Sequence, residues 1–262
     1  MTNKLKFGQI KPNLGHSINW GHPLAKGLVG HWLMNEGTGN VVQDLSGNDH
    51  TGTLVNNAIW GAGTKYGMGV ICNDATNRRI TVPHSTALDM VGEYTIIVGL
   101  NTQDSGTGGF IGKRNGAAVW WGWGTFLGKL IFWTNTNSYP VSTATGYNDG
   151  LDHIVAFTRR GTTGIFYQDG RFLESKTVDG ADLSNTASLE IGLMVSDSYV
   201  LDGTIYFVYL FNRALSASEV AALSAKPFGM FRPTFSVWWY SGIGGEPPVT
   251  SIPIFMYHYL NH

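Results

Sequence analysis

Cysteine is nearly absent from this sequence, because Cys72 is the only one among 262 residues. A single cysteine excludes an internal disulfide, since that bond joins two cysteines. A chain of this length does not need one, because folding buries roughly 70–75% of the surface that the unfolded chain exposes. Cys72 ends the apolar run GVIC at 69–72, and we expect it to be a small buried residue rather than a reactive thiol.

Charged side chains are also scarce. Lys, Arg, Asp and Glu make up 13% of the residues, and the formal net charge is −1. No run of basic residues stands out along the chain. The sequence therefore offers no electrostatic basis for binding nucleic acid.

Long apolar runs are missing as well. No stretch approaches the roughly 18 consecutive apolar residues of a transmembrane helix, so we expect no membrane span. Residues 1–16 lack the apolar core and the small-residue cleavage site of a secretory signal. We therefore expect synthesis in the cytoplasm without a signal peptide, followed by release through another route such as lysis of a host cell, or by retention inside the cell.

Aromatic residues and glycine are abundant: aromatics account for 13% of the chain, and 35 residues are glycine. This balance is typical of an all-β sandwich with many short strands and tight turns. Turn signals recur, among them SGTGG at 105–109 and Asn115-Gly116. The clearest hairpin signal is Asp169-Gly170 between two alternating runs, which favours a type I′ turn.

Residues 202–223 combine a strand with a helix. Strict alternation predicts that Ile205, Phe207, Tyr209 and Phe211 share one face. Both faces of this strand are apolar, so we expect other layers to cover both of them. Ser216 and Glu219 have the spacing of a capping box that opens a short helix through Leu223.

Four ordered segments together resemble the laminin-G-like, concanavalin A-type jelly-roll family. They are GLVGHWLMNEGTG at 27–39 with DLSGN at 44–48, LDHIVAFT at 151–158, the Asp169-Gly170 hairpin, and the strand and helix at 202–223. The resemblance implies a concanavalin A-like (laminin-G-like) jelly-roll sandwich with one short C-terminal helix. It covers roughly 28–225, which leaves an N-terminal arm at 1–27 and a C-terminal arm at 226–262. This fold hosts lectins, hydrolases and structural proteins alike, so it does not decide function.

The sequence shows no catalytic constellation. Glycoside hydrolases of this fold place two acidic residues two positions apart on one strand, and no two carboxylates here have that spacing. A G-x-S-x-G nucleophile elbow is missing too. His153 matches the histidine of the family's central strand, where a packing role is the simplest interpretation. We predict that the protein is not an enzyme and has no catalytic residues.

Two tryptophans are the candidate ligand-binding residues. Trp121 and Trp123 would share one strand face, and flat rings two positions apart can stack on sugars. The alternative is that these indoles fill the sandwich or are covered by a neighbouring subunit.

A calcium site is a further hypothesis, since no other cofactor is implied. Some laminin-G-like domains hold calcium at the rim of the sandwich through aspartates and carbonyl oxygens, and Asp44, Asn48 and Asp49 lie in the matching region. The alternative is a turn whose side chains cap their own backbone.

The C-terminal arm has the composition of an assembly element. Its candidate assembly residues are aromatic or apolar, and a Gly/Pro-rich linker at 242–248 separates them into two groups: Trp238 and Trp239, then Ile254, Phe255, Tyr257 and Tyr259. Such a segment can bury its side chains against another chain or add a strand to an open sheet edge. The alternative is that both arms fold back onto their own sandwich.

The arms carry a second resemblance. NWGHPLAKGLVG at 19–30 and FGMFRP at 228–233 resemble laminin-G-like proteins of tailed bacteriophages. This implies a non-enzymatic virion structural protein, such as a capsid decoration, head fibre or tail appendage, exposed at the virion surface. Its partners would be its own subunits, other virion proteins and a weakly bound saccharide. The alternatives are a stand-alone carbohydrate-binding module or lectin, and a glycoside hydrolase.

Overall fold

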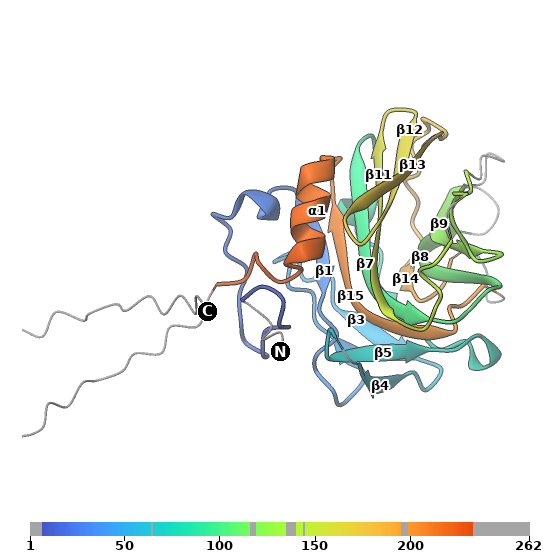
Figure 1. Ribbon diagram of the computed structural model, residues 1–262. Helices are drawn as coiled ribbons and strands as arrows, with labels where there is room; N and C mark the ends of the chain where they lie inside the picture. The colour runs from blue at the N-terminus through green and yellow to red at the C-terminus, as the bar shows by residue number, and fades with distance from the viewer. Residues whose placement is uncertain are drawn as a thin grey trace, which may run out of the picture.

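The computed structural model describes residues 7–63, 65–115, 119–134, 140–143, 145–194 and 199–232. These residues form two antiparallel sheets packed face to face, with a third layer on the outer side of one sheet (Figure 1). The fold is therefore the predicted all-β concanavalin A-like sandwich. Among the described residues, no helix combines the length and the apolar character needed to cross a membrane.

The first sheet has eight strands, seven of them in the order β13-β12-β11-β7-β15-β5-β4. The eighth strand, β1, pairs with the C-terminal half of β15, whereas β5 pairs with its N-terminal half. Its strands are β1 (Leu28–Trp32), β4 (Ile59–Ala62), β5 (Met68–Cys72), β7 (Tyr94–Thr102), β11 (Asp152–Arg160), β12 (Thr163–Gln168), β13 (Arg171–Thr177) and β15 (Gly203–Phe211).

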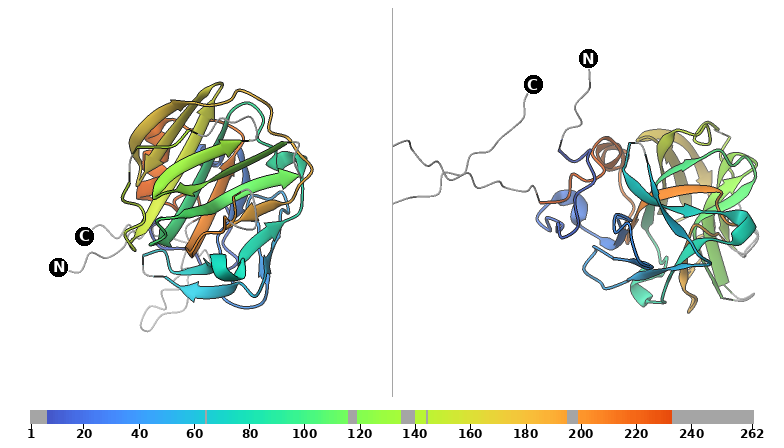
Figure 2. Two further views of the ribbon diagram at one scale, coloured as in Figure 1. Left: turned by 90° about the vertical axis from the view of Figure 1, so that its right-hand side faces the viewer. Right: turned by 90° about the horizontal axis from the view of Figure 1, so that it is seen from below.

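The second sheet has seven strands in the order β10-β9-β8-β14-β6-β3-β2, and it faces the viewer in the left view of Figure 2. Its strands are β2 (Val41–Val42), β3 (Gly52–Val55), β6 (Arg79–Val82), β8 (Thr107–Asn115), β9 (Val119–Phe126), β10 (Lys129–Thr134) and β14 (Leu189–Ile191). The helices in the described part of the chain are α1 (Ala217–Ala225) and three short 3-10 turns, η1 (Pro23–Ala25), η2 (Asp74–Thr76) and η3 (Thr86–Leu88).

Local sequence signals account for the hairpin and the helix. Asp169 and Gly170 both have positive φ, 50° and 78°, as the predicted type I′ turn between β12 and β13 requires. The predicted capping box is present at the start of α1: the Ser216 side chain accepts the backbone N–H of Glu219, and the Glu219 carboxylate accepts that of Ser216.

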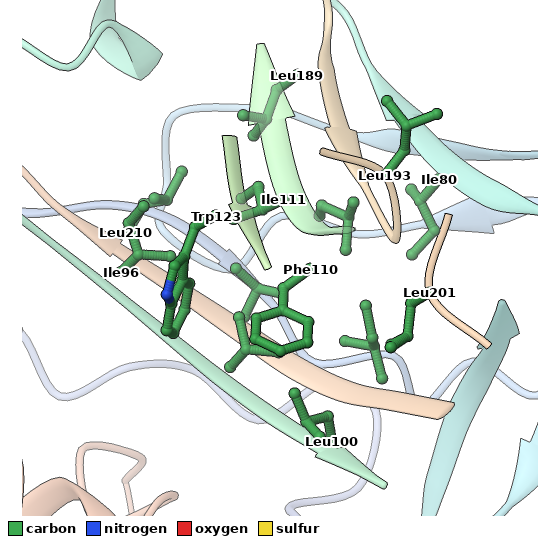
Figure 3. Close-up of a cluster of buried hydrophobic side chains, with 14 of the residues drawn as sticks. Ile80, Ile96, Leu100, Phe110, Ile111, Trp123, Leu189, Leu193, Leu201 and Leu210 are labelled. Carbon is green, nitrogen blue, oxygen red and sulfur yellow. The ribbon is translucent and has the colours of Figure 1, made fainter. Parts of the chain in front are cut away.

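The main core lies between the two sheets. It contains a stack of Phe132 on Phe157, with ring centroids 4.4 Å apart and planes 7° from parallel. Figure 3 shows another part of it, where Trp123 lies among Ile96, Leu210 and Phe110. Cys72 is fully buried in the same core, as predicted, and burial raises the pKa of its thiol to about 12. Apolar packing between the two sheets therefore holds the sandwich together.

Strand β15 departs from the strict alternation predicted for it. Its pairing with β7 shifts register between Ile205 and Phe207, which marks a β-bulge. The bulge places Tyr206 and Phe207 in the outer apolar cluster, whereas Ile205 and Val208 lie in the core between the sheets. The prediction that Ile205 and Phe207 share a face is therefore wrong.

The third layer consists of α1 and the two segments that flank the sandwich in sequence (Figure 1). Ile18 and Phe231 form an antiparallel bridge, and the backbone N–H of Asn19 donates to the carbonyl of Met230 at 2.7 Å. The described residues of both predicted arms, 7–27 and 226–232, thus pack on their own sandwich, which is the folded-back alternative for these residues. We refer to α1, 7–26 and 226–232 as the terminal layer.

The inter-sheet stack generates a stability prediction. Phe132→Ala should lower the free energy of unfolding by about 3–5 kcal/mol, because it removes a buried ring and leaves a cavity. The control is Phe172→Ala, since Phe172 is 58% exposed, and it should cost less than about 1 kcal/mol. Urea denaturation measures both, and equal losses would contradict this assignment of the core.

Candidate functional site

The two tryptophans predicted to bind sugar lie inside the sandwich. Trp121 and Trp123 are both 0% exposed, and Trp123 packs edge-on against Phe110 with ring centroids 5.3 Å apart. A buried indole cannot stack on a sugar at the surface, so the prediction of a stacking platform at these two residues is corrected. They take the alternative role of filling the sandwich.

The neighbouring tryptophan, Trp120, faces the other way. It lies on the outer face of the second sheet with Trp133 of β10, and their ring centroids are 5.5 Å apart in an edge-to-face arrangement. Tyr199 adds a third ring, 5.7 Å from that of Trp133. These three half-buried rings and Val141 pack over Ile131 and Met194. We call Trp120, Trp133 and Tyr199 the aromatic cluster.

Glycines of β8 make room for the segment that brings Tyr199 to the cluster. A Cβ on Gly109 would lie 1.9 Å from the backbone nitrogen of Met194, and one on Gly112 would lie 1.8 Å from the Met194 carbonyl oxygen. The backbone at Met194 thus lies directly on the sheet, and Val200 bridges Gly109 in parallel. Gly108 and Gly109 therefore lie within a strand, rather than in the turn that SGTGG at 105–109 suggested.

The sequence did not reveal which face of β9 is buried in the core. Alternation puts Trp120, Gly122 and Gly124 on one face and Trp121 and Trp123 on the other. It does not say which face points into the core. Gly122 and Gly124 were an available signal, because glycine on a sheet face often marks the close approach of another backbone or a ligand.

A shallow polar cleft of about 500 Å³ lies where β7 ends and β15 begins. The polar residues that line it include Gln103, Asp104, Asp202 and Thr204. The backbone N–H of Gly106 donates to the Asp104 carboxylate, and the Asn73 amide donates to that of Asp202. Carboxylates such as those of Asp104 and Asp202 and an amide such as that of Gln103 can hydrogen-bond sugar hydroxyl groups. This cleft is therefore a second candidate surface for a saccharide.

The predicted calcium residues form a self-capped turn. The Asp44 carboxylate accepts the backbone N–H groups of His31, Ser46 and His50 and the Ser46 hydroxyl, at distances from 2.7 to 3.0 Å. The Asn48 amide donates to the Val29 carbonyl at 3.1 Å. Asp49 is exposed and has φ 57°. Because these donors occupy both oxygens of Asp44, the arrangement is that of the turn alternative.

His153 is held between two carboxylates. Its Nδ1 lies 2.7 Å from Asp169 Oδ2, and its Nε2 lies 3.0 Å from Asp149 Oδ1. Burial lowers the pKa of His153, but the hydrogen bonds with Asp169 and Asp149 outweigh burial, and the net shift is upward. With both nitrogens occupied by carboxylates, His153 is suited to anchoring the β12–β13 turn.

The predicted assembly residues Trp238, Trp239, Ile254, Phe255, Tyr257 and Tyr259 lie outside the described residues.

Comparison with known proteins locates this chain among lectin-like sandwiches. The family model of the concanavalin A-like lectin/glucanases superfamily matches residues 74–221. No curated protein matches the sequence. The match begins after β5 and ends within α1.

Solved structures with this fold include saccharide complexes. The binding domain of Paraclostridial Mosquitocidal Protein 1 is similar at a TM-score of 0.61 with 16% identity, over 77% of this chain and 52% of that one. Domain 4 of AbnA, a GH43 extracellular arabinanase from Geobacillus stearothermophilus, was solved with arabinotriose; it matches at 0.57 with 19% identity, over 75% of this chain and 98% of the domain. Trypanosoma rangeli sialidase, solved with sialic acid, matches at 0.57 with 19% identity, over 77% of this chain and 33% of the enzyme.

This chain spans about half the length of the toxin binding domain that it matches. At these identities the likeness shows the fold alone.

The His153 contacts generate a pH prediction. Because the folded-state pKa of His153 is raised, its contribution to stability is fully present below the unfolded pKa of roughly 6.5 and is lost as pH rises through the folded pKa. His153→Gln should therefore lower the melting temperature more at pH 5.5 than at pH 8.5. Thermal melts of both proteins across this range test it, and an equal loss at both pH values would contradict it.

Proposed function

The chain belongs to the concanavalin A-like lectin/glucanase superfamily, and we propose that it is a non-enzymatic structural protein of a bacteriophage particle that displays a saccharide-binding sandwich. The saccharide site in this proposal is the aromatic cluster on the outer face of the second sheet. The observation that carries it is the grouping of Trp120, Trp133 and Tyr199, half-buried, on that face.

The chemistry of the cluster suits sugars. Sugar rings present C–H groups on their faces, and these pack against the electron-rich faces of aromatic side chains. The three rings come from β9, β10 and the segment after β14, so the sheet and its glycines hold them in fixed positions. A preformed aromatic surface loses little conformational entropy on binding. Stacking of this kind needs no metal ion.

The order of the layers supports a display role. The terminal layer covers the outer side of the first sheet (Figure 1). The aromatic cluster lies on the outer face of the second sheet. A protein attached through its terminal segments would therefore present the aromatic cluster away from the attachment. The resemblance of 19–30 and 228–233 to phage proteins is the sequence observation behind the virion context.

The non-enzymatic part of the proposal rests on how carboxylates near the sheets are used. Asp89 pairs with the buried Lys113 at 2.5 Å, and Glu190 accepts both Arg79 Nε at 2.9 Å and Thr81 Oγ1 at 2.7 Å. Asp152 accepts from the Tyr206 hydroxyl and the Asn101 amide, each at 2.9 Å. A glycosidase needs one carboxyl group as acid and another as base or nucleophile beside the scissile bond. These carboxylates instead stabilise the fold.

A stand-alone saccharide-binding module is the second candidate. The match to 98% of domain 4 of the arabinanase favours it, because the sandwich has the extent of a complete module of that kind. Both candidates use the same aromatic cluster, and they differ in whether the protein is part of a particle. Mass spectrometry of purified virions from the producing bacterium separates them.

The proposal predicts the effect of removing one tryptophan ring from the aromatic cluster. Trp133→Ala and Trp120→Ala should each weaken binding of a glycan-array hit at least about tenfold, which corresponds to the loss of about 1.4 kcal/mol of stacking energy. The matched control is Phe172→Ala, which removes an exposed ring on β13 in the other sheet. Binding should be unchanged in EDTA.

The array should include arabino-oligosaccharides, sialylated oligosaccharides and bacterial surface polysaccharides, with isothermal titration calorimetry on the hits. Unchanged affinity in both tryptophan variants would refute the aromatic cluster as the site. Loss of affinity in Asp104→Asn alone would assign binding to the polar cleft. Release of reducing sugar from any hit would show an enzyme.

A further inference from the structure

The terminal layer carries a group of exposed apolar side chains. Four large apolar residues in 7–20 are more than half exposed, at 51–61%: Phe7, Ile10, Leu14 and Trp20. They account for four of the eleven large apolar side chains that are exposed among the described residues. We call these four residues the terminal patch. Scattered exposed apolar residues are ordinary, but several on one short segment indicate an interaction site.

The segment that bears the patch is fixed to the sandwich. Lys11 extends inward, and its ammonium group donates to the backbone carbonyls of Tyr206 at 2.8 Å, Met34 at 3.5 Å and Met68. Burial lowers the pKa of Lys11 to about 7, against the opposing charge of Glu36. The Lys11 contacts therefore fix this segment to the sandwich, while the side chains of the patch remain exposed to solvent.

The chain leaves the described structure beside this patch. The backbone N–H of Arg232 donates to the Ser17 carbonyl at 3.0 Å, between Leu14 and Trp20 in sequence. The sequence continues for thirty residues, 233–262. Fully extended, these could span roughly 100 Å. The segment 233–262 thus begins beside the stretch of chain that bears the terminal patch.

The end of that segment matches the patch chemically. Residues 249–260, VTSIPIFMYHYL, contain no Lys, Arg, Asp or Glu and carry seven large apolar or aromatic side chains: Ile252, Ile254, Phe255, Met256, Tyr257, Tyr259 and Leu260. The linker at 242–248, with three glycines and two prolines, separates this segment from 233–240. An uncharged apolar segment gains free energy by covering apolar surface, about 25 cal/mol per Å².

We propose that the terminal patch is the docking surface for residues 249–260 of a second copy of this chain. Two copies that face each other through their terminal layers bring the start of each segment close to the partner's patch. The exchange is then reciprocal, as the two-fold symmetry of a homodimer requires. The aromatic clusters point away from such an interface, on opposite sides of the dimer. The inference deepens the assembly part of the proposed function and is independent of saccharide binding.

The experiment measures oligomeric state by size-exclusion chromatography with light scattering. The full chain should be a dimer. Deletion of 249–262 should give a monomer, and so should the double variant Ile10→Ser/Leu14→Ser. The matched control Val91→Ser/Leu151→Ser removes apolar side chains of similar exposure, 55% and 63%, elsewhere on the surface, and it should remain a dimer.

Mixing two defective chains identifies the occupant of the patch. The deletion chain keeps its patch, and the Ile10→Ser/Leu14→Ser chain keeps its C-terminal segment. Neither alone should assemble, whereas the mixture should form a heterodimer through one intact patch and one intact segment. A full chain that is a monomer would overturn the proposal, because the segment would then cover its own patch or bind another protein. A dimer that survives deletion of 249–262 would overturn it as well.

Glycan binding of the deletion chain separates this inference from the proposed function. A monomeric chain that retains its saccharide affinity shows that the aromatic cluster works without assembly. A full chain that dimerises but binds no glycan would contradict the proposed saccharide site alone.

Discussion

The arrangement of the whole molecule depends on one constraint: both faces of the central strands of the first sheet, β7, β11 and β15, are apolar and must be covered. Strand β15 carries Val208 and Leu210 toward the core between the sheets, and Phe207, Tyr209 and Phe211 toward the outside. Leaving an outer ring exposed to water would forfeit roughly 1.5–3 kcal/mol per side chain. The second sheet covers the inner face, so the terminal layer has to cover the outer one. This requirement brings the two ends of the described chain together at the Ile18–Phe231 bridge.

The same constraint gives the molecule two distinct sides. The terminal layer occupies one side, and the outer face of the second sheet remains on the other (Figure 1). On that second side, glycines of β8 let the backbone of Met194 lie on the sheet, which brings Tyr199 to Trp133. The proposed attachment and the proposed saccharide site are therefore separated by the full thickness of the sandwich.

The sequence predicts those features that depend on local chemistry. The Asp169-Gly170 turn, the Ser216–Glu219 capping box and the buried Cys72 all follow from short-range rules, and the structure confirms them. The candidate site was harder to predict, because it depends on which face of β9 points inward. Alternation alone is symmetric between the two faces, so it could not choose Trp120 over Trp121. The bulge between Ile205 and Phe207 could not be predicted for a related reason. An inserted residue reverses which face the following side chains occupy, and only the pairing with β7 reveals it.

Hydrogen–deuterium exchange with and without a bound oligosaccharide from the glycan array is the most direct test of the central claim, that saccharides bind the outer face of the second sheet. The account predicts added protection in peptides that cover β9, β10 and residues 199–201, with little change in α1 or in residues 7–26. Protection confined to residues 101–104 and 202–204 would place the ligand in the polar cleft, and protection in the terminal layer would place it on the opposite side. Either of these results would contradict the account.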